Sequence, residues 1–99
     1  MCISLVDFIS VLINANYPQK VDLISNVTTV EGGHWHTVAL KNDGTVWTWG
    51  HNFYGELGNG NREHSEKPVQ VVGLKDITKI ASVGYFTLAI DKNGDVWAW

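Results

Sequence analysis

Four histidines are the residues of this chain best suited to binding a metal ion. His34 and His36 are two positions apart, so on a β-strand their imidazoles would lie on the same side, and His51 and His64 follow further along. Zinc sites usually complete such a pair with ligands at short, characteristic spacing. The only cysteine is Cys2, and no cluster of Asp or Glu residues accompanies the histidines. The sequence therefore predicts neither a metal site nor a cofactor.

A glycine-rich stretch, GELGNG at residues 55–60, has the composition of a phosphate-binding loop. Phosphate loops lead into a helix whose N-terminus faces the anion, but here the polar stretch NREHSEK and then Pro68 follow. We therefore interpret these glycines as tight-turn residues. The sequence also offers no recognisable catalytic nucleophile. The one cysteine is at position 2, and no serine lies in a motif typical of a nucleophilic serine. The sequence predicts that the chain is not an enzyme.

Five tryptophans are many for 99 residues, and four of them form two pairs, Trp47 with Trp49 and Trp97 with Trp99. Exposed pairs of indole rings could stack on sugars or bases, or absorb ultraviolet light. The alternative is packing in a core, where each ring buries about 150–250 Å². We favour packing.

The two tryptophan pairs belong to an internal repeat. Residues 18–49 align without a gap on residues 68–99, a shift of 50 positions, and nine of the 32 aligned positions are identical. A period near 50 is typical of stacked supersecondary units rather than of one self-contained core. The repeat divides the chain into a non-repeat segment over 1–17, a first repeat over 18–67 and a truncated second repeat over 68–99.

Each repeat predicts an antiparallel β-hairpin. HTVALK at residues 36–41 and TVWTWG at residues 45–50 both alternate with period 2, and Asn42-Asp43-Gly44 lies between them, matched by Lys92-Asn93-Gly94. Further candidate strands are the stretches VTTVEGG, ITKIASV and PVQVVG. We therefore predict an all-β fold of three- to four-stranded antiparallel sheets that stack face to face, as propeller blades do.

Residues 30–60, VEGGHWHTVALKNDGTVWTWGHNFYGELGNG, resemble the repeat of the regulator of chromosome condensation family. Glu56 replaces the family's usual Gln, and the second repeat has Val83 and Phe86 where the first has Gly33 and His36. The positions at which this chain has the residue type typical of the family repeat are Gly33, His36, Thr37, Ala39, Leu40, Asp43, Gly44, Trp49, Gly50, Asn52, Gly55, Leu57, Gly58 and Gly60.

The resemblance implies a β-propeller, which in this family closes about seven four-stranded blades into a ring and so hides the edge strands. This chain has about one and a half blades, and we interpret it as an incomplete propeller derived from a longer ancestor, with assembly of several copies as the alternative. The resemblance implies that His36 is a hydrogen-bonded structural residue. In all, we predict structural roles for Gly33, His36, Thr37, Gly44, Trp47, Trp49, Gly50, Gly55, Leu57, Gly58, Gly94, Trp97 and Trp99.

The segment over residues 1–17 does not follow the repeat. Leu5, Phe8, Ile9, Leu12 and Ile13 have the spacing of an amphipathic helix, and a strand is the alternative. The segment has no basic residue and carries an acidic one, so we expect neither a signal peptide nor a membrane span. The sequence predicts no particular cellular compartment for the protein.

Function is predicted from the charge and from the loop over residues 51–67, which is the longest one expected in this chain. The net charge is −3, which disfavours nucleic acid. We expect a non-catalytic module that binds a partner protein, further propeller repeats or its own copies. The alternatives are a part of a guanine-nucleotide exchange factor for a small GTPase, which the family's namesake implies, and a Trp-rich photoreceptor-like or carbohydrate-binding repeat. The predicted binding residues are Asn52, Phe53, Tyr54, Glu56, Arg62, Glu63 and His64.

Overall fold

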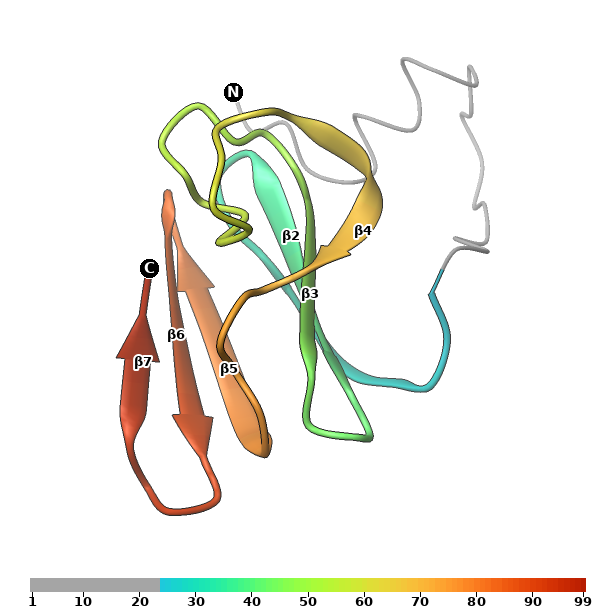
Figure 1. The fold of residues 1–99 in the computed structure, drawn as a ribbon, viewed down its shortest axis with the longest axis vertical. Coiled ribbons are helices and arrows are strands. Elements are labelled where there is room, and N and C mark those ends of the chain that lie inside the picture. The colour runs from blue at the N-terminus through green and yellow to red at the C-terminus, as the bar shows by residue number, and fades with distance from the viewer. Residues whose placement is uncertain (1–23) are drawn as a thin grey trace.

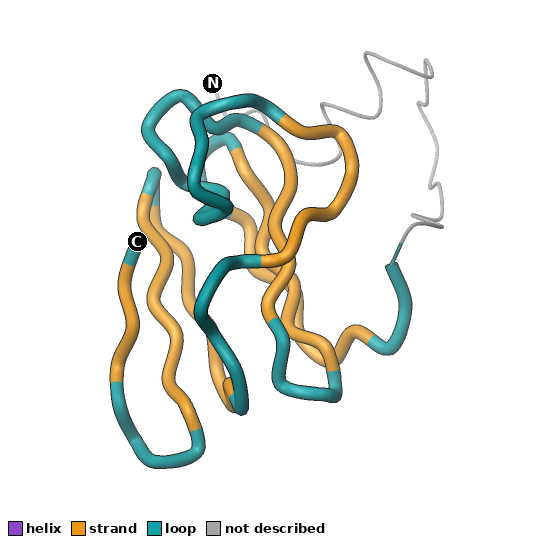
Figure 2. The backbone as a smooth tube through the Cα atoms, in the orientation of Figure 1, coloured by secondary structure: helices purple, strands orange, loops and turns teal. Residues whose placement is uncertain are grey.

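The computed structural model describes residues 24–99, and they form two antiparallel β-sheets (Figure 1). The helix predicted within residues 1–17 lies outside the described residues. The strands of the first sheet follow one another in the order β1-β2-β3-β4, and those of the second in the order β5-β6-β7. Their bounds are β1 Val27–Gly32, β2 His36–Lys41, β3 Val46–Gly50, β4 Ser65–Gln70, β5 Ile77–Val83, β6 Phe86–Asp91 and β7 Val96–Ala98. The described residues contain no helix, which confirms the all-β prediction (Figure 2).

The predicted hairpins are both present, and glycine closes each one. Ala39 pairs with Trp47 across β2 and β3, and Ala89 pairs with Trp97 across β6 and β7. Gly44 and Gly94 both have φ of +84°, a backbone conformation that only glycine adopts without strain. The two turns therefore have the same local geometry, as the repeated sequence indicates.

The fourth strand of the first sheet comes from the segment that the alignment assigns partly to the second repeat. β4 pairs with β3 through Thr48 and Val69 and through Trp47 and Gln70, so Pro68 lies in the first sheet. It occupies an edge strand, where a missing N–H group is tolerated. The sheet boundary thus falls after Gln70, whereas the repeat boundary after residue 67 is a property of the sequence alignment.

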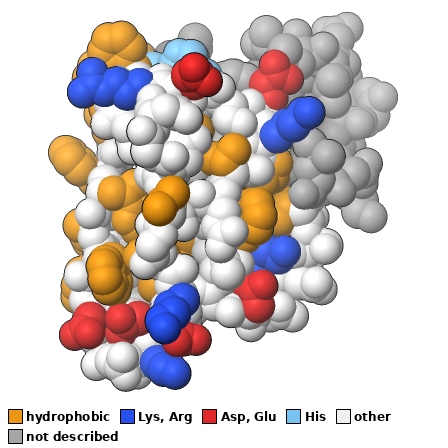
Figure 3. Space-filling model, viewed as in Figure 1, with side chains coloured by type: hydrophobic (Ala, Val, Ile, Leu, Met, Phe, Trp, Pro, Cys, Tyr) orange, Lys and Arg blue, Asp and Glu red, His pale blue; other side chains and the backbone are white. Residues whose placement is uncertain are grey.

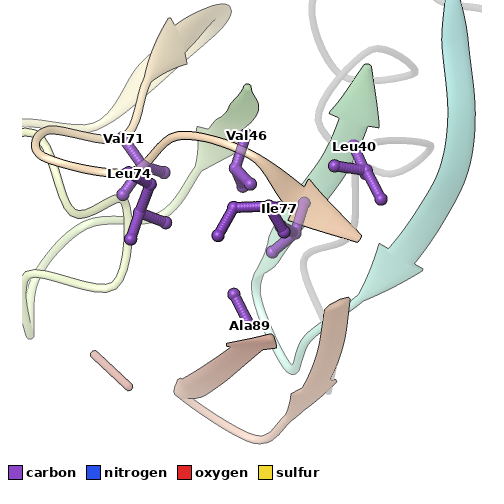
Figure 4. Packing of buried hydrophobic residues seen from close by; sticks show 7 residues of the cluster. Leu40, Val46, Val71, Leu74, Ile77 and Ala89 are labelled. Carbon is purple, nitrogen blue, oxygen red and sulfur yellow. The ribbon is translucent and has the colours of Figure 1, made fainter. Parts of the chain in front are cut away.

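The core lies between the two sheets. Strand pairing puts Val38 and Leu40 of β2 on the same face as Val46 of β3, and this face meets Ile77 of β5 and Ala89 of β6 (Figure 4). Val71 and Leu74, from the connection between β4 and β5, complete the buried cluster, against which Ile80 and Trp99 pack. Face-to-face stacking, as expected of propeller blades, therefore holds the two sheets together.

The equivalent face of the second sheet is open. Leu88, Ile90 and Val96 follow Val38, Leu40 and Val46 by 50 positions, but Leu88 is 49% and Val96 is 65% exposed. Figure 3 shows hydrophobic side chains on the surface of this part of the molecule. The same apolar pattern is therefore buried in the first sheet and exposed in the second, because a neighbouring sheet covers only the first.

The four paired tryptophans have different environments. Trp49 is buried, and Trp99 is half-buried against the core cluster, with its indole Nε1–H donating to the carbonyl oxygen of Glu56 at 3.1 Å. Trp47 is half-buried, with the Lys41 ammonium 5.3 Å from its ring centroid. Trp97 is 45% exposed. Trp99 thus links the second repeat to the loop after β3 of the first repeat.

Comparing Gly44→Ala with Gly94→Ala tests how the first hairpin turn meets the second sheet. The positive φ makes alanine cost about 1 kcal/mol at either position. A Cβ at Gly44 would also lie 2.9 Å from the Asp76 Cα, whereas a Cβ at Gly94 would meet nothing within 4 Å. We expect Gly44→Ala to lower the free energy of unfolding by roughly 1–3 kcal/mol more than Gly94→Ala. Urea denaturation measures both values, and equal losses would contradict the close approach.

Val38→Glu and Leu88→Glu test the covered and the open apolar face at equivalent positions. A carboxylate at Val38 would be buried without a partner, and we expect it to lower the free energy of unfolding by more than about 3 kcal/mol. We expect the native chain to self-associate through the open face, and Leu88→Glu to reduce that association while the fold stays intact. Size-exclusion chromatography with light scattering measures the association. A native chain that is monomeric at all concentrations would disprove the prediction for Leu88.

Candidate functional site

Asn52 organises the long loop between β3 and β4 from the inside. Its side chain is fully buried, and its amide nitrogen donates to the carbonyl oxygens of Asn61 and Glu63, both at 3.0 Å. Its amide oxygen accepts from the N–H of Leu57 at 2.9 Å, and its own backbone N–H donates to Nδ1 of His64, also at 2.9 Å. One side chain thereby ties together loop positions up to 11 residues away.

Glu56 is the second buried polar residue of this loop. One of its carboxylate oxygens, Oε1, accepts from the backbone N–H of Tyr54 at 2.8 Å, and the other, Oε2, lies 2.9 Å from Nδ1 of His51. Both oxygens thus have partners inside the loop, which offsets the cost of burying a carboxylate. The glutamate that stands where the family usually has glutamine is therefore accommodated by His51.

The loop also covers Trp99 of the second sheet, and a glycine makes this approach possible. Gly58 has φ of +65°, and a Cβ there would lie 2.9 Å from the Trp99 Nε1 and 3.0 Å from the Val71 Cγ1. Leu57 beside it is fully buried, and the Thr48 hydroxyl donates to its carbonyl oxygen at 2.6 Å. The glycine-rich stretch is thus a set of turns that fits the loop onto the inter-sheet core; in the structure it leads to β4.

Aromatic and imidazole rings meet at the end of the sheets where this loop lies. The ring centroids of Tyr54 and Tyr85 are 4.7 Å apart, those of Trp35 and Tyr85 are 5.7 Å apart, and those of Phe53 and Tyr54 are 5.1 Å apart, all with edge-to-face geometry. His51 contacts Trp35 at 4.8 Å. We call this group the rim cluster, and its members are His34, Trp35, His51, Phe53, Tyr54, His64 and Tyr85.

Two rings of the rim cluster are largely exposed, and a backbone hydrogen bond joins two of the segments that carry the cluster. Phe53 is 58% and Tyr54 is 59% exposed, which are high fractions for aromatic rings in a contact network. Three separate segments supply the rings: the turn between β1 and β2, the loop between β3 and β4, and the turn between β5 and β6. The N–H of His34 donates to the carbonyl oxygen of Gly84 at 2.6 Å and so joins the two turns. The cluster is a surface that both sheets build together.

His36 lies below the rim cluster, between the two sheets. It is fully buried, and its Nε2 is 3.1 Å from Oγ1 of Thr87 and 3.3 Å from Oγ of Ser82, both on the second sheet. A Cβ at Gly33 would lie 2.5 Å from Nδ1 of this ring, so only glycine leaves room for the imidazole. The second repeat has Val83 and the exposed Phe86 at the equivalent positions.

The predicted binding residues divide into two groups. Phe53, Tyr54 and His64 belong to the rim cluster, and Arg62 and Glu63 are exposed beside it in the same loop. Asn52 and Glu56, by contrast, are buried and make their side-chain contacts within the loop. Sequence reasoning did not include His34, Trp35, His51 and Tyr85 in the binding surface. The signal for two of them was the aromatic pair Trp35 and Tyr85, which are 50 positions apart.

The described part of the chain has neither a cluster of metal ligands nor a helix that could span a membrane. Within residues 24–99, no group of three or more His, Cys, Asp or Glu side chains is arranged to hold a metal ion. His34 is exposed while His36 is buried, so the pair does not present a common exposed site. In the same residues no helix has the length and apolar character needed to cross a membrane.

Asn52→Ala tests whether the loop is held from within. The change leaves the Leu57 N–H and the loop carbonyl oxygens without their side-chain partners, so we expect the free energy of unfolding to fall by roughly 2–4 kcal/mol. Asn52→Asp keeps the acceptor but loses the amide donor, and we expect an intermediate loss. Asn93→Ala, at an exposed turn position, is the control and should change stability by less than about 0.5 kcal/mol. Thermal and urea denaturation measure the three variants, and a loss at Asn52 no larger than at Asn93 would contradict this role.

Comparison with known proteins identifies the repeat. A profile of the regulator of chromosome condensation (RCC1) repeat matches residues 43–90, and a second profile of the same repeat matches residues 27–56. The chain is 38% identical over 88 residues to the human E3 ubiquitin-protein ligase HERC2, covering 85% of this chain and 2% of HERC2. It is 37% identical over 87 residues to the ultraviolet-B receptor UVR8 of Arabidopsis thaliana, covering 83% of this chain and 20% of UVR8.

Solved structures show the same fold. The crystal structure of human WBSCR16 superposes with a TM-score of 0.73 at 23% identity, over 83% of this chain and 21% of that one. Yeast RCC1 (Prp20), in its crystal structure with Kap60, superposes with a TM-score of 0.68 at 24% identity, over 83% of this chain and 18% of that one. The chain thus spans about a fifth or less of the length of these relatives. The repeat profiles, the curated relatives and the stacked antiparallel sheets confirm the resemblance, and the chain belongs to the RCC1 repeat family.

Proposed function

We propose that this chain is a non-catalytic RCC1-repeat module that binds a partner protein through the rim cluster. The observation that carries the proposal is the exposure of Phe53 and Tyr54 within a network of aromatic rings from three segments. Aromatic residues are enriched at protein interfaces, and Tyr and Trp are enriched among the few residues that dominate the binding energy. They are here mounted on loops over a rigid sheet scaffold, the usual arrangement of binding residues.

The support of the loop fits this role. Because Asn52 and Glu56 fix the loop by buried hydrogen bonds, the exposed rings on its outside lose little conformational freedom when a partner binds. Preorganised aromatic rings give large contact areas at low entropic cost. The two buried residues would therefore position Phe53 and Tyr54 rather than touch the partner.

The charge of the chain favours a protein partner over nucleic acid. The net charge is −3, and the loop that carries Phe53 and Tyr54 has both the exposed cation Arg62 and the exposed anion Glu63 beside it. Such a surface offers no excess of cations to displace counterions from phosphates. A mixed rim around aromatic rings is instead the composition of a protein interface.

Related proteins also support a protein partner. Yeast RCC1 (Prp20) was crystallised with Kap60, and Prp20p from Saccharomyces cerevisiae has been described with its binding properties to Gsp1p and histones. HERC2 is named a ubiquitin ligase, but this chain covers only 2% of it, so the comparison gives no support for ligase activity in this chain. Nucleotide exchange, the alternative that the family implies, would be an activity of a longer protein, since the chain spans 18% of the Prp20p structure.

Site-specific crosslinking tests the proposed surface. A photoreactive phenylalanine analogue at Phe53 should capture a discrete partner in a cell extract, and the same analogue at the exposed Val72, outside the rim cluster, should not. With that partner purified, we expect Tyr54→Ala to weaken binding at least about tenfold, because a hot-spot ring contributes about 1.4 kcal/mol or more. The melting temperature should stay nearly constant, because Tyr54 is exposed.

Val72→Ser provides the matched control in the binding measurement, because Val72 is exposed like Tyr54 but lies after β4. Its affinity for the partner should equal that of the native chain. Equal capture from positions 53 and 72, or unchanged affinity for Tyr54→Ala, would overturn the proposal.

A further inference from the structure

His36 is a side chain through which the first repeat makes hydrogen bonds to the second. It comes from β2, and its Nε2 is 3.1 Å from Oγ1 of Thr87 on β6 and 3.3 Å from Oγ of Ser82 on β5. The ring has no solvent exposure. Whatever changes the hydrogen-bonding state or the charge of this imidazole therefore acts directly on the contact between the sheets.

The hydrogen-bond network indicates which nitrogen carries the proton. The hydroxyl of Ser82 donates to the carbonyl oxygen of Phe86 at 3.2 Å, so its oxygen is left to accept from Nε2–H of His36. Nδ1 has no hydrogen-bond partner and lies against Gly33. The neutral imidazole with its proton on Nε2 thus fits the site. A second proton, on Nδ1, would give the ring a positive charge and a buried N–H group without a hydrogen-bond acceptor, which is unfavourable.

The groups around His36 offer little compensation for that charge. From the second sheet, β5 and β6 present the neutral hydroxyls of Ser82 and Thr87. From the loop after β3, Glu56 and His51 act in opposite directions, and Oε2 of Glu56 lies 2.9 Å from Nδ1 of His51. The turn before β2 contributes Gly33 and the exposed His34. Desolvation by burial lowers the pKa of His36; the Glu56 carboxylate raises it and His51 lowers it, both to a smaller extent.

We infer that His36 is a pH-sensitive latch between the two repeats: the neutral imidazole holds the second sheet on the first, and acid releases it. Because the latched state favours the neutral ring, its stabilisation is complete above the ordinary imidazole pKa of about 6.5. It is lost as the pH falls below that value towards the lower pKa of the latched ring. The ratio of latched to released molecules falls by at most about tenfold per pH unit, the limit for uptake of one proton.

The latch also bears on the rim cluster. Tyr85 belongs to the second repeat, whereas Trp35 and Tyr54 belong to the first, so release of the second sheet would separate rings that now touch. Acid would then dismantle the surface to which we assign partner binding. This consequence rests on the proposed function, whereas the latch itself does not.

Indole N–H signals in NMR spectra of the ¹⁵N-labelled chain test the latch without any partner. The Trp99 Nε1–H crosses between the repeats to the carbonyl oxygen of Glu56, while the Trp47 Nε1–H donates to Thr45 Oγ1 within the first repeat. Between pH 7.5 and pH 5 we expect the Trp99 signal to move to its unbonded position. We expect the Trp47 signal to stay, since the first sheet remains folded.

Three substitutions identify the group responsible. His36→Phe reproduces the residue of the second repeat at this position, and His36→Gln keeps an N–H donor near Thr87 without a titrating ring. Both should abolish the pH response of the Trp99 signal, and His36→Gln serves if His36→Phe does not fold. His34→Gln, at an exposed histidine two residues away, should respond like the native chain.

Three results would overturn the inference. The first is a Trp99 signal that does not change between pH 7.5 and pH 5 in the native chain. The second is an undiminished pH response in His36→Gln. The third is simultaneous loss of the Trp47 and Trp99 signals, which would show that acid unfolds the whole chain and does not release one sheet. None of these results bears on whether Phe53 and Tyr54 contact a partner at neutral pH, so the two proposals fail separately.

Discussion

Burial of the apolar face of the first sheet against the second is the constraint on which the rest of this structure depends. Val38, Leu40 and Val46 are buried in one cluster with Ile77 and Ala89 of the second sheet. Each aliphatic side chain buried in this way contributes roughly 1.5–3 kcal/mol. The connection after β4 adds Val71 and Leu74 to the same cluster. The first sheet therefore has an apolar face that the second sheet covers, which is the principle of a repeat protein.

Several polar groups at this apolar contact form hydrogen bonds, and these bonds lie at the end of the molecule that carries the rim cluster. His36 meets the hydroxyl of Thr87, and the Trp99 indole meets the carbonyl oxygen of Glu56, so both hydrogen bonds cross between repeats. The buried amide of Asn52 holds the loop that lies over Trp99. The same set of buried bonds thus joins the sheets, shapes the loop and keeps the aromatic rings of the rim cluster in contact at its surface.

The two repeats show how one local pattern acquires different roles through its neighbours. Gly44 and Gly94 have the same φ, but only Gly44 lies against the backbone of Asp76. Val38 is buried and the equivalent Leu88 is exposed. Gly33 and His36 change together to Val83 and Phe86, which is consistent with the ring of His36 occupying the space that a side chain at Gly33 would need. Equivalent residues of the two repeats therefore share the backbone geometry of the turns, but they differ in burial and so in their contribution to stability.

The sequence by itself determined the strands, the hairpins and the repeat family, because period-2 alternation, an Asn-Gly or Asp-Gly turn and a shift of 50 positions are all local or translational features of the chain. Only the tertiary structure decided that the strand containing Pro68 completes the first sheet, that Asn52 and Glu56 lie inside the loop, and that Trp35 and Tyr85 meet Tyr54. These features depend on which face of each sheet another segment covers and on which loops converge at one end. Neither is encoded in the alternation of any single strand, because both arise from contacts between residues that are up to 51 positions apart in the chain.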